Sequence, residues 1–201
     1  MNGKEGEDVF YLEKEKHSLS LLNPAILVID VQNYFFQKDA PAYLRGSERI
    51  LKNIIQLLTE VKSIKKDIPV IGTIHKGWND NMHSWWGNVV TNEWAVPLVP
   101  QELLDNLIEK STYDAFYDTN LNDLLKSKNV NQLIITGVMT HLCCETTARS
   151  GFVRGYKIVM VEDCLWDKDE WYHYASLKNI AHGFGVIANK DEILQILKAI
   201  E

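Results

Sequence analysis

The amino-acid sequence predicts an α/β fold with three layers, in which helices cover both faces of a doubly wound, mostly parallel sheet. Short, continuous apolar runs alternate along the chain with longer segments whose apolar residues recur at helical spacing. The apolar runs lack the strict alternation of a half-exposed strand, which is typical of strands buried on both faces of a parallel sheet. Chains that alternate strand and helix in this order form right-handed crossovers and build such a sheet.

The expected strands and helices follow one another from residue 24 to the end of the sequence. The strands are predicted at residues 24–30, 68–75, 130–137, 156–163 and 184–188. The helices are predicted at residues 48–66, 121–129, 141–155, 170–182 and 190–200. In the segment 48–66, apolar residues recur at helical spacing: Ile50, Leu51, Ile54, Ile55, Leu57, Leu58 and Val61.

Residues 76–100 interrupt this rhythm, because they are aromatic and rich in Asn and show no clear hydrophobic period. A loop of that length inside a compact domain is usually functional. With 201 residues, 46% of them hydrophobic, the chain is long enough for one well-buried core and short for two. We therefore expect a single domain over residues 1–201, with a polar N-terminal arm at 1–23 and an irregular aromatic loop at 76–100 over the site.

Charge and cysteine content argue against several classes of function. The formal net charge of -6 is opposite to the clustered Lys and Arg of a nucleic-acid-binding surface. No segment reaches the ~18 apolar residues of a membrane-spanning helix, and the charged N-terminus lacks the apolar core of a signal peptide. Three unevenly spaced cysteines fit a reducing compartment. We expect a cytoplasmic protein with a small-molecule substrate and no nucleic-acid or membrane partner.

Ligands of doubly wound sheets bind beyond the carboxyl ends of the strands, and this rule selects candidate residues. Asp30 ends the first predicted strand, His75 ends the second, residues 136–143 follow the third, and Asp163 ends the fourth. An acid that ends a buried strand either caps a neighbouring loop or serves a site. His75 either contacts a substrate or is a structural histidine with its hydrogen bonds satisfied.

Two of the three cysteines stand side by side in TGVMTHLCCETTAR, residues 136–149. Thr140 is placed as an N-cap, so that Cys143 falls in the first helical turn, where free N–H groups and the helix dipole favour a thiolate. Either cysteine could instead pack as a small buried hydrophobe. Cys143 and Cys144 face about 100° apart on such a helix, and helical geometry does not choose between them. Gly137 would allow the backbone to approach a ligand closely.

Three segments resemble the signature blocks of the isochorismatase-like cysteine hydrolases. They are ILVIDVQNYFF (26–36), KSTYDAFYDTNLNDLL (110–125) and IITGVMTHLCCETTARSGFVRGYKIVMVEDC (134–164), and they occur in the order of that family. The superfamily includes nicotinamidases, N-carbamoylsarcosine amidohydrolases, ureidoacrylate and maleamate amidohydrolases and true isochorismatases. The resemblance implies an α/β hydrolase of small molecules.

The resemblance also implies a catalytic triad of Asp, Lys and Cys. Asp30 matches the Asp-x-Gln motif, Lys110 stands four residues before DAF (114–116), and Cys143 follows Gly-Val-x-Thr by three positions. Asp30 would take the thiol proton of Cys143, and Lys110 would hold Asp30 ionised. The thiolate would then attack an amide or ureide carbonyl and form a thioester. Cys144 stands where Val is usual, and we expect it in the core.

The family further implies a cis peptide bond, here between Val138 and Met139. The backbone N–H groups of Met139 and Cys143 would form the oxyanion hole that receives the carbonyl oxygen of the substrate.

Residues 74–87 depart from the nicotinamidases, which bind a divalent metal through Asp-x-His and a further His. This region holds His75, Asp80 and His83 but no Asp-x-His, so we expect no metal and no other cofactor, which counts against nicotinamidase activity. His75, Trp85 and Trp86 are the candidate substrate contacts. The two tryptophans either anchor the loop to the core or to a second subunit, or one of them forms a wall for a planar substrate.

Three other functions stay open. One is vinyl-ether hydrolysis of an isochorismate-like acid, for which members of the family can use the Asp as proton donor without the cysteine. The others are a non-catalytic binding role and thiol redox chemistry, with Cys144 or Cys164 as the resolving thiol of Cys143. The intact triad favours amide hydrolysis. The family also leads us to expect a homodimer or homotetramer.

Overall fold

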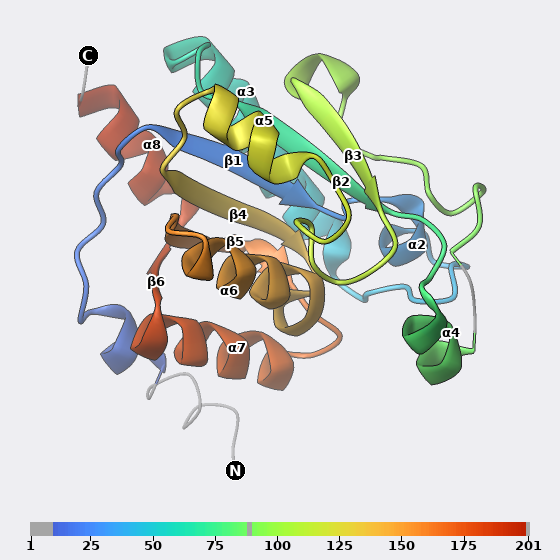
Figure 1. The fold of residues 1–201 in the computed structure, drawn as a ribbon. Coiled ribbons are helices and arrows are strands. Elements are labelled where there is room, and N and C mark those ends of the chain that lie inside the picture. Colours follow the sequence, from blue (N-terminus) through green and yellow to red (C-terminus); the bar gives the residue numbers. More distant parts are fainter. Residues whose placement is uncertain (1–9, 88–89, 200–201) are drawn as a thin grey trace.

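The computed structural model describes residues 10–87 and 90–199 and confirms the predicted α/β class (Figure 1). Six strands form one sheet in the order β3-β2-β1-β4-β5-β6, and every neighbouring pair is parallel. The strands are β1 (Pro24–Ile29), β2 (Val70–His75), β3 (Asn106–Lys110), β4 (Gln132–Val138), β5 (Lys157–Trp166) and β6 (Gly185–Ala188).

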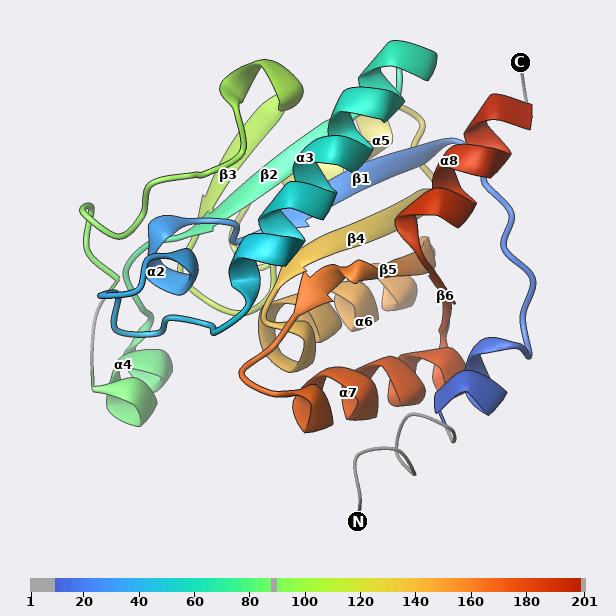
Figure 2. The same ribbon diagram turned by 180° about the vertical axis from the view of Figure 1, so that it is seen from behind.

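Helices cover both faces of the sheet and give the predicted three layers. On one face lie α3 (Ser47–Ile64) and α8 (Lys190–Ala199), and on the other lie α5 (Leu121–Ser127), α6 (Glu145–Val153) and α7 (Glu170–Gly183) (Figures 1 and 2). Each face has its own apolar cluster. Ile54, Leu57 and Leu58 of α3 belong to the first cluster, and Leu121, Ala148 and Leu177 belong to the second.

Strand β1 lies in the middle of the sheet, between β2 and β4. Its residues Ala25 to Ile29 are all buried, and their side chains alternate between the two apolar clusters. A strand in this position has no solvent-facing side, which explains why its sequence is continuously apolar. The central position also places the carboxyl end of β1 between those of its two neighbours.

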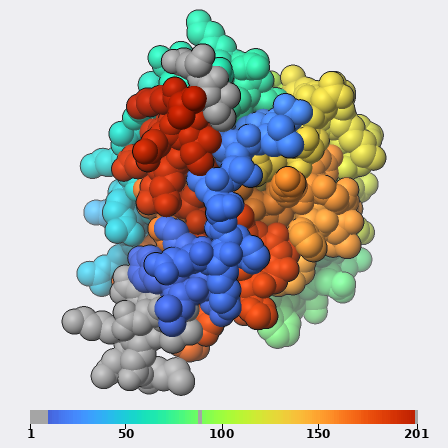
Figure 3. Space-filling view, turned by 90° about the vertical axis from the view of Figure 1, so that its left-hand side faces the viewer, coloured from blue at the N-terminus to red at the C-terminus, as the bar shows by residue number. Residues whose placement is uncertain are grey.

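The N-terminal segment lies against the C-terminal part of the fold (Figure 3). Phe10 is fully buried in the second apolar cluster, and Lys14 Nζ lies 2.6 Å from Glu162 Oε1 on β5. The predicted polar arm at 1–23 therefore contains a packing residue, while its residues 1–9 lie outside the described part of the chain. Among the described residues, no helix has the length and apolar character needed to cross a membrane.

The sequence analysis missed strand β3 and ended β5 too early. Strand β3 lies at the edge of the sheet, and only its residues Ile108 and Lys110 are buried. Its sequence therefore lacks the continuous apolar run from which the other strands were predicted. Strand β5 continues past Asp163 to Trp166. A short helix, α4 (Asp80–Trp86), lies inside the predicted irregular loop at 76–100, of which residues 88–89 are outside the description.

Helix α4 has one buried residue, Met82, so its sequence shows no apolar stripe. Asn79 is its N-cap, and the Asn79 side chain accepts a hydrogen bond from the Met82 N–H. Three further short elements complete the fold: α2 (Asn33–Phe36), the 3-10 turn η1 (Gln101–Leu103) and the π-helical turn η2 (Thr140–Cys144).

Candidate active site

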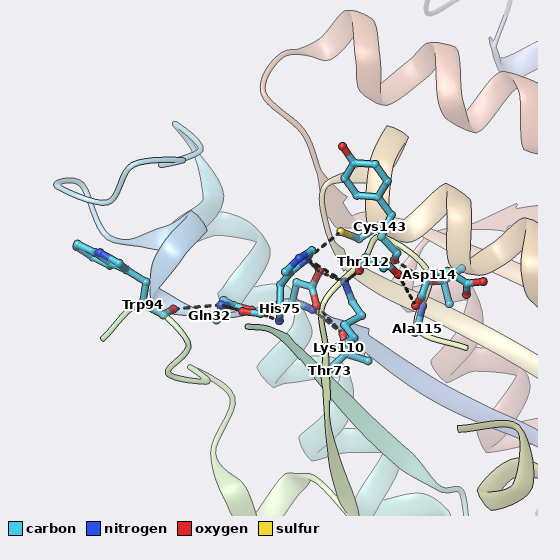
Figure 4. A network of polar contacts seen from close by, with 12 residues as sticks. Gln32, Thr73, His75, Trp94, Lys110, Thr112, Asp114, Ala115 and Cys143 are labelled. Carbon is cyan, nitrogen blue, oxygen red and sulfur yellow. Dashed lines mark hydrogen bonds and ion pairs between the residues drawn. The ribbon is translucent and has the colours of Figure 1, made fainter. Parts of the chain in front are cut away.

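Four adjacent strands bring the predicted triad and His75 to one edge of the sheet. Asp30 follows β1, His75 ends β2, Lys110 ends β3, and Cys143 lies in η2 just after β4. All four residues are at most 3% exposed. The carboxyl-end rule therefore gathers residues that are up to 113 positions apart in sequence, as Figure 4 shows for three of them.

Lys110 is held by three acceptors. Its Nζ lies 2.7 Å from Asp30 Oδ2, donates to the Thr112 backbone oxygen at 2.9 Å, and lies 3.2 Å from His75 Nδ1. The ammonium group is thus held between a carboxylate, a backbone oxygen and a ring nitrogen. Burial opposes the charge, but Asp30 and then Cys143 outweigh it and raise the pKa of Lys110 above its ordinary value.

Asp30 is an ionised carboxylate with a fixed orientation. Burial acts to raise its pKa, but the positive charge of Lys110 outweighs that effect and holds the pKa of Asp30 well below its ordinary value. Thr73 donates its hydroxyl to Asp30 Oδ1 at 2.7 Å, and Asp30 itself has a φ of 53°, in the left-handed region that Asp tolerates. The sequence analysis missed Thr73, whose position two residues before His75 puts it on the same face of β2.

His75 lies among the three triad residues. Its Nδ1 is 4.0 Å from Cys143 Sγ and 3.8 Å from Asp30 Oδ2. Gln32 fixes the backbone of His75, because its Oε1 accepts the His75 N–H at 2.7 Å and its Nε2 donates to the His75 oxygen at 2.9 Å. Burial lowers the pKa of His75 below its ordinary value, which keeps the imidazole neutral near pH 7.

The cysteine turn differs from the expected one in two ways. Thr140 is not an N-cap: Met139 takes that position, and the Thr140 hydroxyl instead pairs with His173 Nδ1 at 2.9 Å. The turn is also π-helical, a geometry found often at functional sites and without a sequence signal of its own. Burial outweighs the positive charge of Lys110 and raises the pKa of Cys143 above its ordinary value, which favours a resting thiol whose proton Asp30 would take.

The backbone before this turn is unusual at two neighbouring positions. Gly137 has a φ of 115°, and a Cβ there would lie 2.0 Å from the Ile29 backbone oxygen. The glycine is therefore required for the close approach of β4 to strand β1. The peptide bond between Val138 and Met139 is cis, as the resemblance implied.

A small cavity of about 70 Å³ opens beside Cys143. Cys143 and His75 line it together with aromatic side chains, while Cys144 is fully buried in the core behind. Trp86 also lines the cavity and donates its indole N–H to the Tyr113 hydroxyl at 2.7 Å. Trp85 is 80% exposed and is not among the lining residues, so the structure brings Trp86 and His75 to the site but not Trp85.

Comparisons with known proteins identify the family of this chain. Residues 24–192 match the family model of the isochorismatase domain. The chain belongs to the isochorismatase family. It is 32% identical over 184 residues to nicotinamidase 3 of Arabidopsis thaliana, covering 86% of this chain and 88% of that protein.

One further relative and one solved structure are also similar to this chain. Enterobactin synthase component B of Escherichia coli K12 is 32% identical over 182 residues, and the match spans 85% of this chain but 62% of that protein. A crystal structure of a cysteine hydrolase from Pseudomonas syringae pv. phaseolicola shares the fold, with a TM-score of 0.81 at 24% identity and coverage of 92% and 97% of the two chains.

Among the described residues, His75, Asp80 and His83 do not come together as one group of possible metal ligands. Asp80 and His83 lie exposed on α4, away from the buried His75. Asp30, His75 and Cys143 do come together within the described residues, with ligand atoms inside 4.8 Å of one another. Lys110 already contacts two of these three residues, and its ammonium would repel a divalent cation placed among them. The residues present do not fit a resident metal.

Proposed function

We propose that this protein is a cysteine hydrolase that releases ammonia or an amine from a small carboxamide or ureide. The observation that carries the proposal is the buried set of Asp30, Lys110 and Cys143, with Lys110 Nζ 2.7 Å from Asp30 Oδ2 and Cys143 at the wall of a small cavity. Membership of the isochorismatase family and the likeness to a nicotinamidase favour C–N bonds as the target.

In the first half-reaction the thiol proton of Cys143 passes to Asp30 as the sulfur attacks the carbonyl carbon of the substrate. The resting thiol and the low-pKa carboxylate make this transfer uphill, so it must accompany attack rather than precede it. The new S–C bond gives a tetrahedral oxyanion. Asp30 then returns the proton to the nitrogen, the C–N bond breaks, and a thioester remains on Cys143.

In the second half-reaction Asp30 takes a proton from water while the oxygen attacks the thioester. The S–C bond breaks, the carboxylic acid leaves, and Asp30 returns its proton to the sulfur. Lys110 acts through Asp30, because its positive charge lies 2.7 Å from Asp30 Oδ2 and keeps the carboxylate ionised. The oxyanion would be received by the backbone N–H groups of Met139 and Cys143.

The test is ammonia release from a panel of primary carboxamides and ureides, with Cys143→Ala and Cys144→Ala as a matched pair of variants. Cys144 is buried in the core next to the site, so its replacement controls for local packing. We expect Cys143→Ala to lose at least a thousandfold in kcat, Cys144→Ala to stay active, and a chelator to have no effect. Turnover that persists in Cys143→Ala would overturn the covalent route and leave Asp30 as sole proton donor, as in vinyl-ether hydrolysis.

We propose, in addition, that the protein works in the cytosol as a homodimer or homotetramer. The three described cysteines are all free and buried, which suits a reducing compartment. Exposed apolar side chains such as Trp85, Val153 and Trp171 offer contact area for a second subunit.

A further inference from the structure

Two buried ring nitrogens at the cavity have no hydrogen-bond partner within the described part of the chain. His75 Nε2 and Trp78 Nε1 are both buried, and neither has a hydrogen-bond partner among residues 10–87 and 90–199. Both side chains line the cavity next to Cys143, and their rings meet edge to face with centroids 4.3 Å apart. Leaving a buried donor unsatisfied costs free energy, so such pairs are rare unless a ligand supplies the acceptor.

The Lys110 contact determines which His75 nitrogen carries the proton. Lys110 Nζ is only a donor, and it lies 3.2 Å from His75 Nδ1. The thiol of Cys143, 4.0 Å away, also faces Nδ1, whereas Asp30 Oδ2 at 3.8 Å is too far to accept a hydrogen bond from it. Nδ1 must therefore be the acceptor, and the proton sits on Nε2. Figure 4 shows the His75 ring next to both Cys143 and Lys110.

The rest of the cavity sets the shape and charge of what can bind. Its walls include the aromatic rings of Tyr34, Phe35, Trp86 and Tyr113, and none of its lining side chains is a Lys, Arg, Asp or Glu. The charge of Lys110 is already neutralised by Asp30. A carboxylate would lose its hydration here without gaining a counter-ion, which is costly, while a flat neutral ring would pack against the walls.

We propose that His75 and Trp78 form a substrate-recognition subsite for a flat, uncharged carboxamide that carries a hydrogen-bond acceptor away from the scissile carbonyl. The acceptor is a ring nitrogen or a carbonyl oxygen, and it receives the Nε2–H of His75 and the Nε1–H of Trp78. This inference rests on the proposed function, because the cleaved amide must sit at Cys143. In this subsite two neutral N–H donors, and not a metal ion, recognise the acceptor of the substrate.

The first experiment compares substrates that differ in one ring atom. Nicotinamide, picolinamide and isonicotinamide place a ring nitrogen at each available position, and benzamide has none. We expect kcat/KM for the best of the three to exceed that for benzamide about tenfold or more. 3-Carbamoylbenzoate, which carries a carboxylate, should be hydrolysed at least tenfold more slowly than benzamide. Equal rates for all four neutral amides, or a preference for the carboxylate, would overturn the subsite.

Variants then locate the preference in the two donors. Trp78→Phe removes the indole N–H while keeping an aromatic ring, and we expect the preferred pyridine amide to lose its advantage over benzamide. His75→Asn should do the same, because its amide reaches only the Nδ1 position, whereas His75→Gln reaches the Nε2 position with an N–H and should retain part of the preference. Trp171→Phe, at an exposed tryptophan on α7, is the matched control and should leave the ratio unchanged.

A binding measurement separates failure of the subsite from failure of the hydrolase proposal. Calorimetry on Cys143→Ala should give a dissociation constant for the preferred pyridine amide about tenfold below that for benzamide, and Trp78→Phe in the same background should equalise them. If this preference is present but the wild-type protein releases no ammonia, the subsite stands and the proposed function fails. If the wild-type protein hydrolyses the amides but the preference is absent, the subsite is refuted.

Discussion

Replacing Lys110 by Met tests whether the Lys110–Asp30 pair organises the site. Both side chains are fully buried, and their charged atoms lie 2.7 Å apart. Methionine keeps most of the lysine's volume but leaves the Asp30 carboxylate in the interior with no cation. Breaking a buried pair in this way costs about 3–5 kcal/mol of unfolding free energy. Thr112 and His75 also lose a donor, so we expect a value toward the upper end of that range.

The double variant Asp30→Asn/Lys110→Met tests whether the cost of Lys110→Met comes from the unpaired charge of Asp30. Because it removes both charges, we expect it to be more stable than Lys110→Met alone, with a coupling free energy of about 3 kcal/mol. The pH dependence has a defined sign. In Lys110→Met the pKa of Asp30 is raised by burial instead of lowered, so the native state binds a proton more readily than the unfolded chain. The deficit of this variant should therefore shrink as the pH falls from 7 to 5.

Urea unfolding of the wild-type protein, both single variants and the double variant gives the four free energies of the cycle. Circular dichroism is the readout, at pH 7 and again at pH 5. If the two single costs add up to the cost of the double variant, or if Lys110→Met loses stability on acidification faster than the wild-type protein, the buried-pair reasoning is wrong.

Two further predictions concern the turn around Cys143. Since burial raises the pKa of Cys143, iodoacetamide should modify this residue slowly at pH 7, and the modification rate should still rise between pH 8 and 10. Peptide mass spectrometry measures this rate. A rate that reaches a plateau below pH 8 would contradict a resting thiol. Burial lowers the pKa of His173 to about 4, so the unfolded chain binds a proton that the native state does not between about pH 6.5 and 4. The free energy of unfolding should fall by up to about 3 kcal/mol as the pH drops through that window. Urea titrations of His173→Gln should lack this part of the pH dependence. If the variant keeps the same dependence of unfolding free energy on pH, His173 is not the group responsible.

One physical pattern predicts the central strands together with Asp30 and His75, whereas Lys110 and the choice of Cys143 over Cys144 came from the family resemblance. A strand buried on both faces has to be continuously apolar, and the polar residue at its carboxyl end is then conspicuous, as Asp30 and His75 are. Parallel pairing brings these ends together whatever lies between them in sequence. The missed strand β3 shows the limit of the pattern, because its Asn106, Leu107 and Glu109 face solvent at the sheet edge.

Other features of the site depend on contacts that no short-range pattern records. Thr73 orients Asp30 from the neighbouring strand, and the ring nitrogens Trp78 Nε1 and His75 Nε2 matter because neither has a hydrogen-bond partner within the described part of the chain. The choice between Trp85 and Trp86 follows from the direction in which helix α4 turns its side chains, and that helix has too few buried residues to be seen in sequence. The π-helical turn likewise has no characteristic residue type from which it could be predicted.

The covalent role of Cys143 is the central claim, and trapping the acyl-enzyme tests it most directly. The wild-type protein is mixed with the best carboxamide substrate, quenched in acid within milliseconds, and digested for mass spectrometry. We expect the peptide that contains Cys143 to gain the mass of the acyl group, and the gain to disappear in Cys143→Ala while it persists in Cys144→Ala. Turnover with no adduct on Cys143 in wild type, or an adduct on Cys144, would contradict the account.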